Sequence, residues 1–576
     1  MRGGGAEAKV LGVLGGRVYD PLNGVDGEIR DIWIRDGVVV DRAALSDGEA
    51  DAAGTIDAHG CWVMPGGVDL HAHIAGKANT GRKLCPDDHR RRTFARQGSL
   101  RSGSGFTTPT TYLTAYLYAQ MGYTTAVEAA SSPIGARHAH EEFEDMPILD
   151  KAMLIVFGNN EFVLECLANG EPEAARHYIA WIMDAVGGYG IKAVNPGGVD
   201  DWKWGGNLHR IDDTLKCFDT TPRRIVSFLA ETADALGLPH PLHLHGLNLG
   251  TPESARTTIE TMEAFEGRRG HLCHLQFLGY EHPRKGHGLA SGAAALAEAL
   301  KRHPNLTVDI GQIVFGAATT MTSDAPLEYH IHQLSGKKWC STDMENEAGS
   351  GVVPLEYKPK SKDGAAQWVT GMELFLLVDD PWRVCLTTDH PNAGPFFCYP
   401  QVIKLLTDAG YRKETLASLN ASVAKGSPLN EIDREYSLYE IAIITRAAPA
   451  RILGLPHKGH LGPGADGDVA VYRPERQGGR NCDCPNAARC SRLLDVAAYT
   501  VKGGEIVVRD GRIVAEPDGE ILTVAPAYDP AIEGRIRNFF KDYYSLSYEN
   551  YPIASLHRRR VIPCADAEAA SVAPRG

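Results

Sequence analysis

At 576 residues the chain exceeds what one compact core usually supports, so we expect a large domain with a smaller companion. With 43% hydrophobic and 23% charged residues it has a globular composition, and no stretch approaches the roughly 18 uncharged apolar residues of a membrane helix. The first residues lack the apolar core of a secretory signal, so we expect a cytoplasmic protein. A net charge of −13 excludes general nucleic-acid binding, because phosphate backbones are held mainly by Lys and Arg.

Two groups of short predicted strands flank the long middle part of the chain, and Gly and Asp turns separate the strands in both groups. In residues 9–64 the strands are Val10–Leu14, Gly16–Tyr19, Asp31–Ile34 and Gly37–Val40. In residues 456–525 they are Asp468–Tyr472, Tyr499–Val508 and Gly511–Val514. We expect residues 9–64 and 456–525 to pair into one small β domain.

The middle part, residues 65–455, alternates apolar strand-like runs with helical stretches, which predicts a parallel α/β barrel. The runs are Gly67–Leu70, Tyr123–Val127, Met153–Phe157, Ile191–Val194, Pro241–His245, Leu306–Ile310 and Val384–Thr388. Barrels gather their chemistry at the C-terminal ends of the strands. The polar residues that end these runs are therefore the first candidates for a site.

Two segments near the C-terminus lie outside this pattern. Residues 526–576 form an extension, and from His557 onward the basic run Arg558–Arg560 and the Ala-rich sequence behind it predict a disordered tail. Cys482, Cys484 and Cys490 cluster with no fourth Cys or His nearby. We interpret them as a reduced surface loop, with a metal site completed by a distant ligand as the alternative.

His71 and His73 give the sharpest local signal for chemistry. Two residues apart on a strand, they project to the same face and can bind one metal together. A single His-x-His is as often structural, but other polar residues end later runs in the same way. These residues are Lys192, His245, His274 and Asp389. Within the neighbouring pairs we prefer His245 to His243 and His274 to His271, since the rejected residues lie deeper in their strands.

One lysine, four histidines and one aspartate in this order form the ligand set of a two-zinc hydrolytic centre, provided that Lys192 is carboxylated. A free lysine is a cation that would repel two metal ions, whereas its carbamate offers two anionic oxygens that can bridge them. A strand lysine alone is more often an ion-pair partner. The interpretation of Lys192 as a carboxylated ligand therefore depends on the whole series of six residues. Imidazole-rich sites favour zinc over iron or manganese.

The ordered series resembles the amidohydrolase superfamily, which implies a (β/α)8 TIM-like barrel with a small β-sandwich domain built from both chain ends. Longer phrases resemble the A subunits of formylmethanofuran dehydrogenases and of formyltransferase/hydrolase complexes. They include His73–Arg82, Met121–Ala126, Gly190–Gly198, Phe315–Pro326, Thr387–Asn392, Glu440–Ala450, Lys458–Asp466 and Tyr543–Pro552. Cys482–Cys490 and the residues after 557 depart from that pattern, as do Ala317 and Ala325, which affects fine substrate contacts but not the ligands.

The resemblance implies two Zn²⁺ ions, with His71 and His73 on one, His245 and His274 on the other, carboxylated Lys192 as the bridge, and Asp389 as ligand and proton carrier. It implies that N-formylmethanofuran, or a methylofuran-type analogue, and water interconvert with formate and the free carrier. The expected partners are the B, C and D subunits of such a complex. The direction of the reaction is not encoded in this chain.

Residues predicted to contact the substrate are Arg82, Lys83, Asn195, His390 and Asn392. Arg82 and Lys83 open a strongly basic loop, 82–101, that could hold the carboxylates of an acidic carrier tail; a contact with another subunit or a solvated loop is an equal alternative. His390 is equally consistent with supporting a ligand or packing in the turn. Two other functions remain open: a cyclic-amide hydrolase like dihydroorotase or hydantoinase, and a metal-free structural subunit.

Overall fold

The structure is a computed structural model that describes residues 8–76, 93–94, 103–104, 108–283, 287–336, 339–341, 347, 349, 351–474, 494–553 and 559–565. Arg82, Lys83 and the rest of the basic loop that would contact the carrier lie outside the described side chains, as do Cys482, Cys484 and Cys490.

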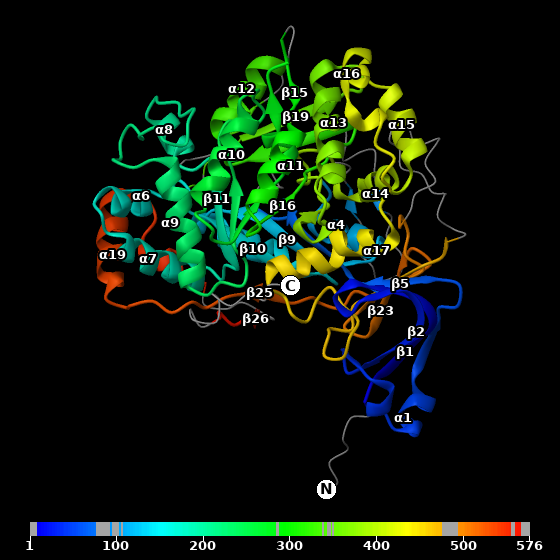
Figure 1. The fold of residues 1–576 in the computed structure, drawn as a ribbon. Coiled ribbons are helices and arrows are strands. Elements are labelled where there is room, and N and C mark those ends of the chain that lie inside the picture. The colour runs from blue at the N-terminus through cyan, green and yellow to red at the C-terminus, as the bar shows by residue number, and fades with distance from the viewer. Residues whose placement is uncertain are drawn as a thin grey trace.

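Eight parallel strands form the central barrel, as the alternating pattern predicts (Figure 1). In chain order they are β6 (Gly67–Ala72), β9 (Tyr123–Ser131), β10 (Asp150–Val156), β11 (Gly190–Val194), β12 (Leu242–His245), β13 (Gly270–Leu272), β16 (Leu306–Asp309) and β20 (Val384–Cys385). The ring closes where Ala72 bridges to His390, just beyond β20, and the backbone N–H of His73 donates to the carbonyl of His390 at 2.7 Å. Strands such as β9 and β10 are buried along their whole length, which explains their continuous apolar runs.

One barrel strand, β13, is absent from the predicted apolar runs, although His274 was expected to end a strand there. It has only three residues, and its middle residue is His271, so it forms neither an apolar run nor an alternating one. Hydrogen bonding to β12 and β16 defines it instead. The pairing of distant segments supplies the information that local sequence lacks.

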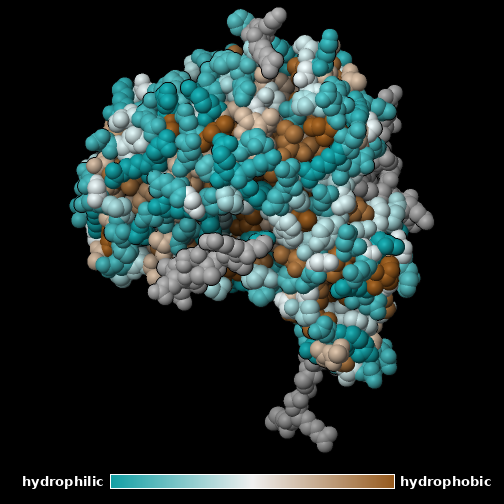
Figure 2. Space-filling view, in the orientation of Figure 1, coloured by the Kyte–Doolittle hydropathy of each residue, from teal (hydrophilic) through white to brown (hydrophobic). Residues whose placement is uncertain are grey.

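Helices surround the barrel and follow its strands. They are α4 (Thr111–Gln120), α5 (Ala136–Glu144), α6 (Glu161–Ala168), α7 (Pro172–Ala185), α8 (Gly198–Lys203), α9 (Pro222–Ala235), α10 (Ser254–Ala264), α11 (Ala293–Arg302), α14 (Tyr399–Thr407), α15 (Ala409–Ala417), α16 (Ala421–Gly426), α17 (Leu438–Ala442) and α18 (Ala448–Leu453). Their apolar faces and the strands share one large buried cluster. Figure 2 shows mainly hydrophilic side chains on the outer face, with separate apolar patches.

A long insertion between β16 and β20 builds a wall above the barrel mouth (Figure 1). It contains β17 (Gly316–Thr322), α12 (Ala325–Ser335), β18 (Cys340–Ser341), β19 (Gly351–Tyr357) and α13 (Lys362–Leu377). Strands β17 and β19 pair antiparallel over seven residues each. Asp324 caps the N-terminus of helix α12, and its side chain accepts a hydrogen bond from the backbone N–H of Leu327.

Strands from both chain ends form one β-rich domain, as expected. They are β1 (Val10–Asp20), β2 (Val25–Arg35), β3 (Val38–Val40), β4 (Gly54–Asp57), β5 (Trp62–Pro65), β21 (Val469–Tyr472), β22 (Tyr499–Lys502), β23 (Glu505–Arg509) and β24 (Arg512–Ile513). The two ends join where β21 pairs antiparallel with β5, so that the strands make one continuous sheet. Its own core contains Val13, Val63, Val469 and Val501.

The prediction of a disordered tail from His557 onward is wrong for residues 559–565. Arg559–Val561 form β26, which pairs with β25 (Ile521–Thr523), and β25 in turn pairs with β10 at the barrel. Arg560 forms ion pairs with Asp466 and Glu520, partners that lie far away in sequence. Within the same extension, α19 (Ile532–Tyr543) packs beside α7 (Figure 1). None of the helices in the described ranges has the length and apolar character needed to cross a bilayer.

Candidate metal centre

The six predicted ligands line one cavity at the C-terminal end of the barrel. The cavity has a volume of about 400 Å³. The predicted ligands are His71, His73, Lys192, His245, His274 and Asp389. Each of these residues is at most 5% exposed, so water shields their charges and lone pairs only weakly. Such a concentration of ionisable groups in a cleft is typical of a functional site.

His71 in β6 and His73 directly after it point their Nε2 atoms at the carboxylate of Asp389. The distances to Oδ1 are 3.0 Å from His71 and 3.4 Å from His73. Burial alone would raise the pKa of Asp389, but the nearby rings of His274 and His71 outweigh it and hold that pKa well below its usual range. Asp389 is therefore an ionised carboxylate, and the three side chains could share one metal ion.

Two buried carboxylates hold the other nitrogen of these rings. Asp309 Oδ2 lies 3.0 Å from His71 Nδ1, and Glu128 Oε1 lies 3.1 Å from His73 Nδ1. The second oxygen of Glu128 accepts the backbone N–H groups of Ile74 and Ala75, which fixes the turn after β6. A carboxylate on Nδ1 leaves Nε2 for a metal, as in most histidine metal sites.

Lys192, at the middle of β11, reaches the cavity next to a cysteine that the sequence pattern does not mark. Its Nζ donates to Cys273 Sγ at 3.0 Å, while the thiol donates to the carbonyl of Leu244 at 3.1 Å. Cys273 Sγ also lies 3.3 Å from His274 Nε2. The thiol thus accepts a hydrogen bond from Lys192 and donates one to Leu244, which holds the lysine amine beside the other predicted ligands.

His245 and His274 complete the set. Burial lowers the pKa of both rings, so they are neutral imidazoles with lone pairs available for a metal. His245 Nε2 lies 3.2 Å from Asp324 Oδ2, and the backbone N–H of His274 donates to Asp309 Oδ1 at 2.8 Å. Among the described residues, His274 Nδ1 is buried without a hydrogen-bond partner. A buried imidazole nitrogen left in this state is costly unless it binds something.

Two of the ligand residues hold an unusual backbone conformation. His274 has φ +37° and Asp389 has φ +46°, the left-handed region that residues with a Cβ rarely adopt. Each such residue costs on the order of 1–3 kcal/mol and persists only where the surrounding structure holds it. The conformation turns the chain in the segments that follow β13 and β20, at the cavity wall.

The rejected histidines lie below the cavity. His243 Nε2 lies 2.9 Å from His71 Nδ1, and His271 Nε2 lies 3.2 Å from Asp309 Oδ2. Neither lines the cavity, whereas His245 and His274 both do. His243 and His271 therefore lie deeper in the barrel than His245 and His274, as the strand pattern predicts.

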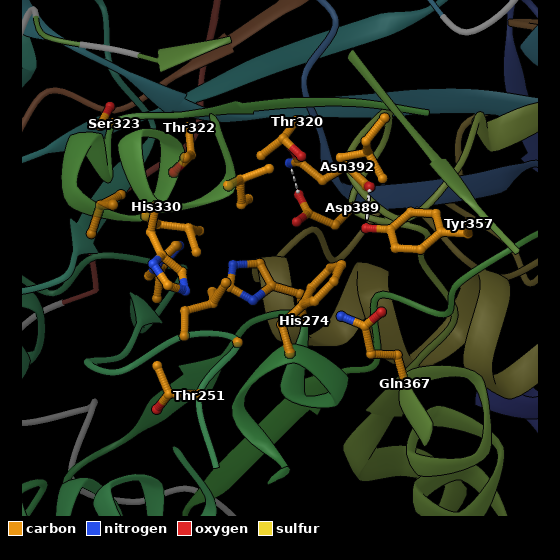
Figure 3. A pocket seen from close by; sticks show the side chains of 18 of the residues that line it. Thr251, His274, Thr320, Thr322, Ser323, His330, Tyr357, Gln367, Asp389 and Asn392 are labelled. Atoms are coloured by element: carbon orange, nitrogen blue, oxygen red, sulfur yellow. Dashed lines mark hydrogen bonds between the residues drawn. The ribbon is translucent and has the colours of Figure 1, made fainter. Parts of the chain in front are cut away.

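The residues predicted to contact substrate separate into two groups. Asn392 lines the cavity, and its Nδ2 donates to Asp389 Oδ1 at 2.9 Å (Figure 3). Asn195 and His390 do not line it. Asn195 Nδ2 donates to Asp324 Oδ1 at 3.1 Å, and the His390 ring accepts the backbone N–H of Phe396 at 3.2 Å while packing edge-on against that residue. Both side chains support neighbours of the cavity instead.

The insertion supplies cavity residues that sequence reasoning missed. Figure 3 shows Tyr357 and Gln367 on one side of His274 and Asp389, and His330 on the other. The Tyr357 hydroxyl donates to the carbonyl of Asn392 at 2.9 Å, so β19 is tied directly to the turn behind Asp389. No spacing signal marks these residues. Asp309, by contrast, is the last residue of β16 and lies one position before the end of a predicted run, so it could have been found by the rule that identified Asp389.

The sequence profile of the amidohydrolase family matches residues 54–508. The chain belongs to this family. Among its relatives, Protein FwdA of Methanocaldococcus jannaschii is 44% identical over 562 residues, 94% of this chain and 96% of the relative. The A subunit of the formyltransferase/hydrolase complex Fhc of Methylorubrum extorquens is 39% identical over 560 residues, 94% of this chain and 96% of the relative.

The comparison with solved structures also finds a formyltransferase/hydrolase complex. A chain in the crystal structure of the formyltransferase/hydrolase complex FhcABCD from Methylorubrum extorquens, in complex with methylofuran, superposes with a TM-score of 0.87 at 36% identity. The match covers 96% of this chain and all of that one. A D-hydantoinase structure shares the fold, with a TM-score of 0.50 at 15% identity over 90% of this chain and 99% of that one.

Proposed function

We propose that this amidohydrolase holds two zinc ions and interconverts an N-formylated carrier of the methanofuran or methylofuran type with formate and the free amine. It would do so as one component of a cytoplasmic complex with B, C and D subunits. The observation that carries the proposal is the convergence of six potential ligands in one buried cavity. The full-length similarity to FwdA and to the Fhc relative narrows the substrate class.

The side chains fit a pair of metal ions. Four imidazoles, a carboxylate and a lysine amine face one cavity, and His274 Nδ1 lacks a partner among the described residues. His71 and His73 would hold one ion, His245 and His274 the other, and carboxylated Lys192 would supply two anionic oxygens between them. When bound, such ions lower the pKa of water and polarise a carbonyl oxygen. Imidazole-rich donor sets favour zinc.

Asp389 is the proton carrier of the proposed reaction. Water adds its oxygen to the formyl carbon and the carbon–nitrogen bond breaks, so one proton must move from the water to the leaving nitrogen. His71, His73 and Asn392 all contact Oδ1 of Asp389. Within the described residues no hydrogen bond reaches Oδ2, so that oxygen is available to accept the proton and return it to the amine. Asn392 holds the carboxylate in place during both transfers.

The two alternative functions have less support. Similarity to a dihydroorotase of Anaeromyxobacter is 49% identity over 65 residues, but it covers only 11% of this chain. A match over so short a segment does not support a shared substrate. A metal-free structural subunit would be expected to have lost ligands, and all six predicted ligands face the cavity.

The proposal is tested by assaying the purified complex with the formylated carrier and, in parallel, with dihydroorotate and hydantoin. We expect formate release from the carrier only, loss of release after treatment with a chelator, and recovery with added zinc. Hydrolysis of a cyclic amide without formate release would establish the alternative enzyme. No reaction with any of the three substrates by the zinc-loaded complex would establish the structural role.

A further inference from the structure

A line of three buried histidines leads away from the metal centre through the barrel interior. It runs from His71 on β6 to His243 on β12 and then to His240, which precedes β12 at the opposite end of the barrel. His243 Nε2 lies 2.9 Å from His71 Nδ1, and His240 Nε2 lies 3.0 Å from His243 Nδ1. The line ends at the backbone carbonyl of Ile452 in α18, 3.1 Å from His240 Nδ1.

These residues occupy a place where barrels normally hold Val, Ile and Leu. All three histidines are fully buried, and buried polar groups are costly unless each is hydrogen-bonded. The line satisfies every one of its ring nitrogens except the one that faces Asp389 and the cavity. Such a line has a fixed order of donors and acceptors, because each ring must donate through one nitrogen and accept through the other.

The carbonyl at the far end sets the direction of the line. A carbonyl can only accept, so His240 Nδ1 carries the proton and its Nε2 accepts. His243 must then donate through Nδ1 and accept through Nε2. His71 in turn donates through Nδ1, which leaves its Nε2 for a metal. His240 and His243 are fully buried, an environment that disfavours the charged imidazolium, so each ring carries one proton, as this order needs.

Asp309 reinforces the same arrangement from the side. Its Oδ2 lies 3.0 Å from His71 Nδ1 and 3.2 Å from His271 Nε2, and a carboxylate also only accepts. The histidine line adds a second constraint, because it fixes which nitrogen of His243 faces His71. If His243 were released and turned its Nε2–H toward His71, two donors would face each other, and His71 would have to move its proton to Nε2.

We propose that His240 and His243 are positioning residues that determine, from the far end of the barrel, which nitrogen of His71 faces the metal. The proposal rests on the proposed metal centre. Its consequence is that His240, which touches neither metal nor substrate, controls metal affinity. Removing a partner of a metal-binding histidine typically weakens metal binding about 10–100-fold.

Two substitutions of matched chemistry test the line in the purified complex. His240→Gln can reach His243 with an amide oxygen and so keeps the acceptor. His240→Asn keeps a donor for the carbonyl of Ile452 but is too short to reach His243. The measurements are the zinc dissociation constant by chelator competition, the absorption spectrum of the cobalt-substituted protein, and the thermal unfolding midpoint.

We expect about 10–100-fold weaker zinc binding and an altered cobalt spectrum for H240N, and near-natural values for H240Q. Equal zinc affinity in the natural protein, H240N and H240Q overturns this proposal, but it does not contradict the proposed metal centre. Equal weakening in both variants also overturns it, because it assigns His240 a packing role. If H240N does not fold, weak zinc binding by folded H240Q also overturns the proposal, because H240Q keeps the acceptor for His243.

Two further outcomes separate this inference from the proposed function. Absence of zinc binding by the natural complex overturns both. A zinc ion located between His71 Nδ1, His243 and Asp309, a group with suitable spacing, would overturn the hydrogen-bonded line.

Discussion

The barrel carries a buried charged cluster at each end, and the two differ in whether they are complete. At the junction with the β-rich domain, Lys458 Nζ contacts Asp150 and lies 2.8 Å from Asp466 and 2.7 Å from Asp468. Lys502 lies 2.7 Å from Asp150 and 3.1 Å from Asp468. Every charge there faces an opposite one. Burial would lower the pKa of Lys458, but the three carboxylates outweigh it and raise that pKa well above its usual range.

The cluster at the cavity is incomplete by the same standard. Several of its side chains could bind a metal ion, and not all of their ring nitrogens have a hydrogen-bond partner within the protein. His274 Nδ1 has none in the described part of the chain. Burial is therefore not what distinguishes a functional cluster from a structural one. A cluster that is satisfied without a ligand joins two domains, whereas one that opens into a cavity with unused lone pairs indicates a missing ligand.

The largest expected effect is on catalysis at the incomplete cluster. Asp389→Asn removes the proposed proton carrier but keeps the size of the side chain, and we expect kcat for formate release to fall about 10²–10⁴-fold. The exposed substitution Asp26→Asn makes the same chemical change elsewhere and serves as control. An Asp389→Asn complex with natural kcat would remove this residue from the proposed proton transfer.

The complete cluster should respond in stability and not in chemistry. Lys458→Met leaves Asp150 and Asp468 buried without their main cation, which costs about 3–5 kcal/mol of folding free energy. Thermal unfolding measures the loss, while zinc content and kcat of the protein that remains folded should be unchanged. A fall in zinc content at full folding would show that the two clusters are coupled and not independent.

A smaller effect is expected for Asn392, which holds the carboxylate of Asp389 without being a ligand. Asn392→Ala removes the hydrogen bond to Oδ1, and we expect kcat to fall about tenfold, the low end for partners of metal ligands. Zinc content should stay at the natural value. Loss of zinc together with activity would instead make Asn392 necessary for assembling the site.

The smallest effect concerns acid stability of the complete cluster. Lysine partners hold the pKa values of Asp150 and Asp468 below their usual range. Groups with depressed pKa values contribute stability that is present above the unfolded pKa of about 3.9 and is lost as pH falls below it. The unfolding midpoint of the natural chain should therefore fall more steeply below about pH 4 than that of Lys458→Met. Parallel curves would contradict this assignment.

The barrel and the pairing of the chain ends could be predicted because long strands leave periodic patterns. Most ligand candidates could be predicted because a polar residue at or just after the end of an apolar run is conspicuous. Lys192 lies in the middle of β11 and is identified only as a member of the ordered series. The three-residue strand β13 leaves no apolar run. Arg560 belongs to the basic run that predicts a disordered tail, and the sequence does not reveal its partners Asp466 and Glu520 because they are distant along the chain. Contacts such as Lys192 with Cys273 likewise depend on how strands neighbour each other in the closed barrel.

The central claim, a two-zinc centre bridged by a carboxylated lysine, is tested most directly by metal analysis of the complex prepared with ¹³C-labelled bicarbonate. We expect two zinc ions per chain and a labelled carbamate on Lys192, and in Lys192→Ala loss of the label with less than one zinc ion per chain. Natural zinc content in Lys192→Ala, or no carbamate in the natural chain, would contradict the account.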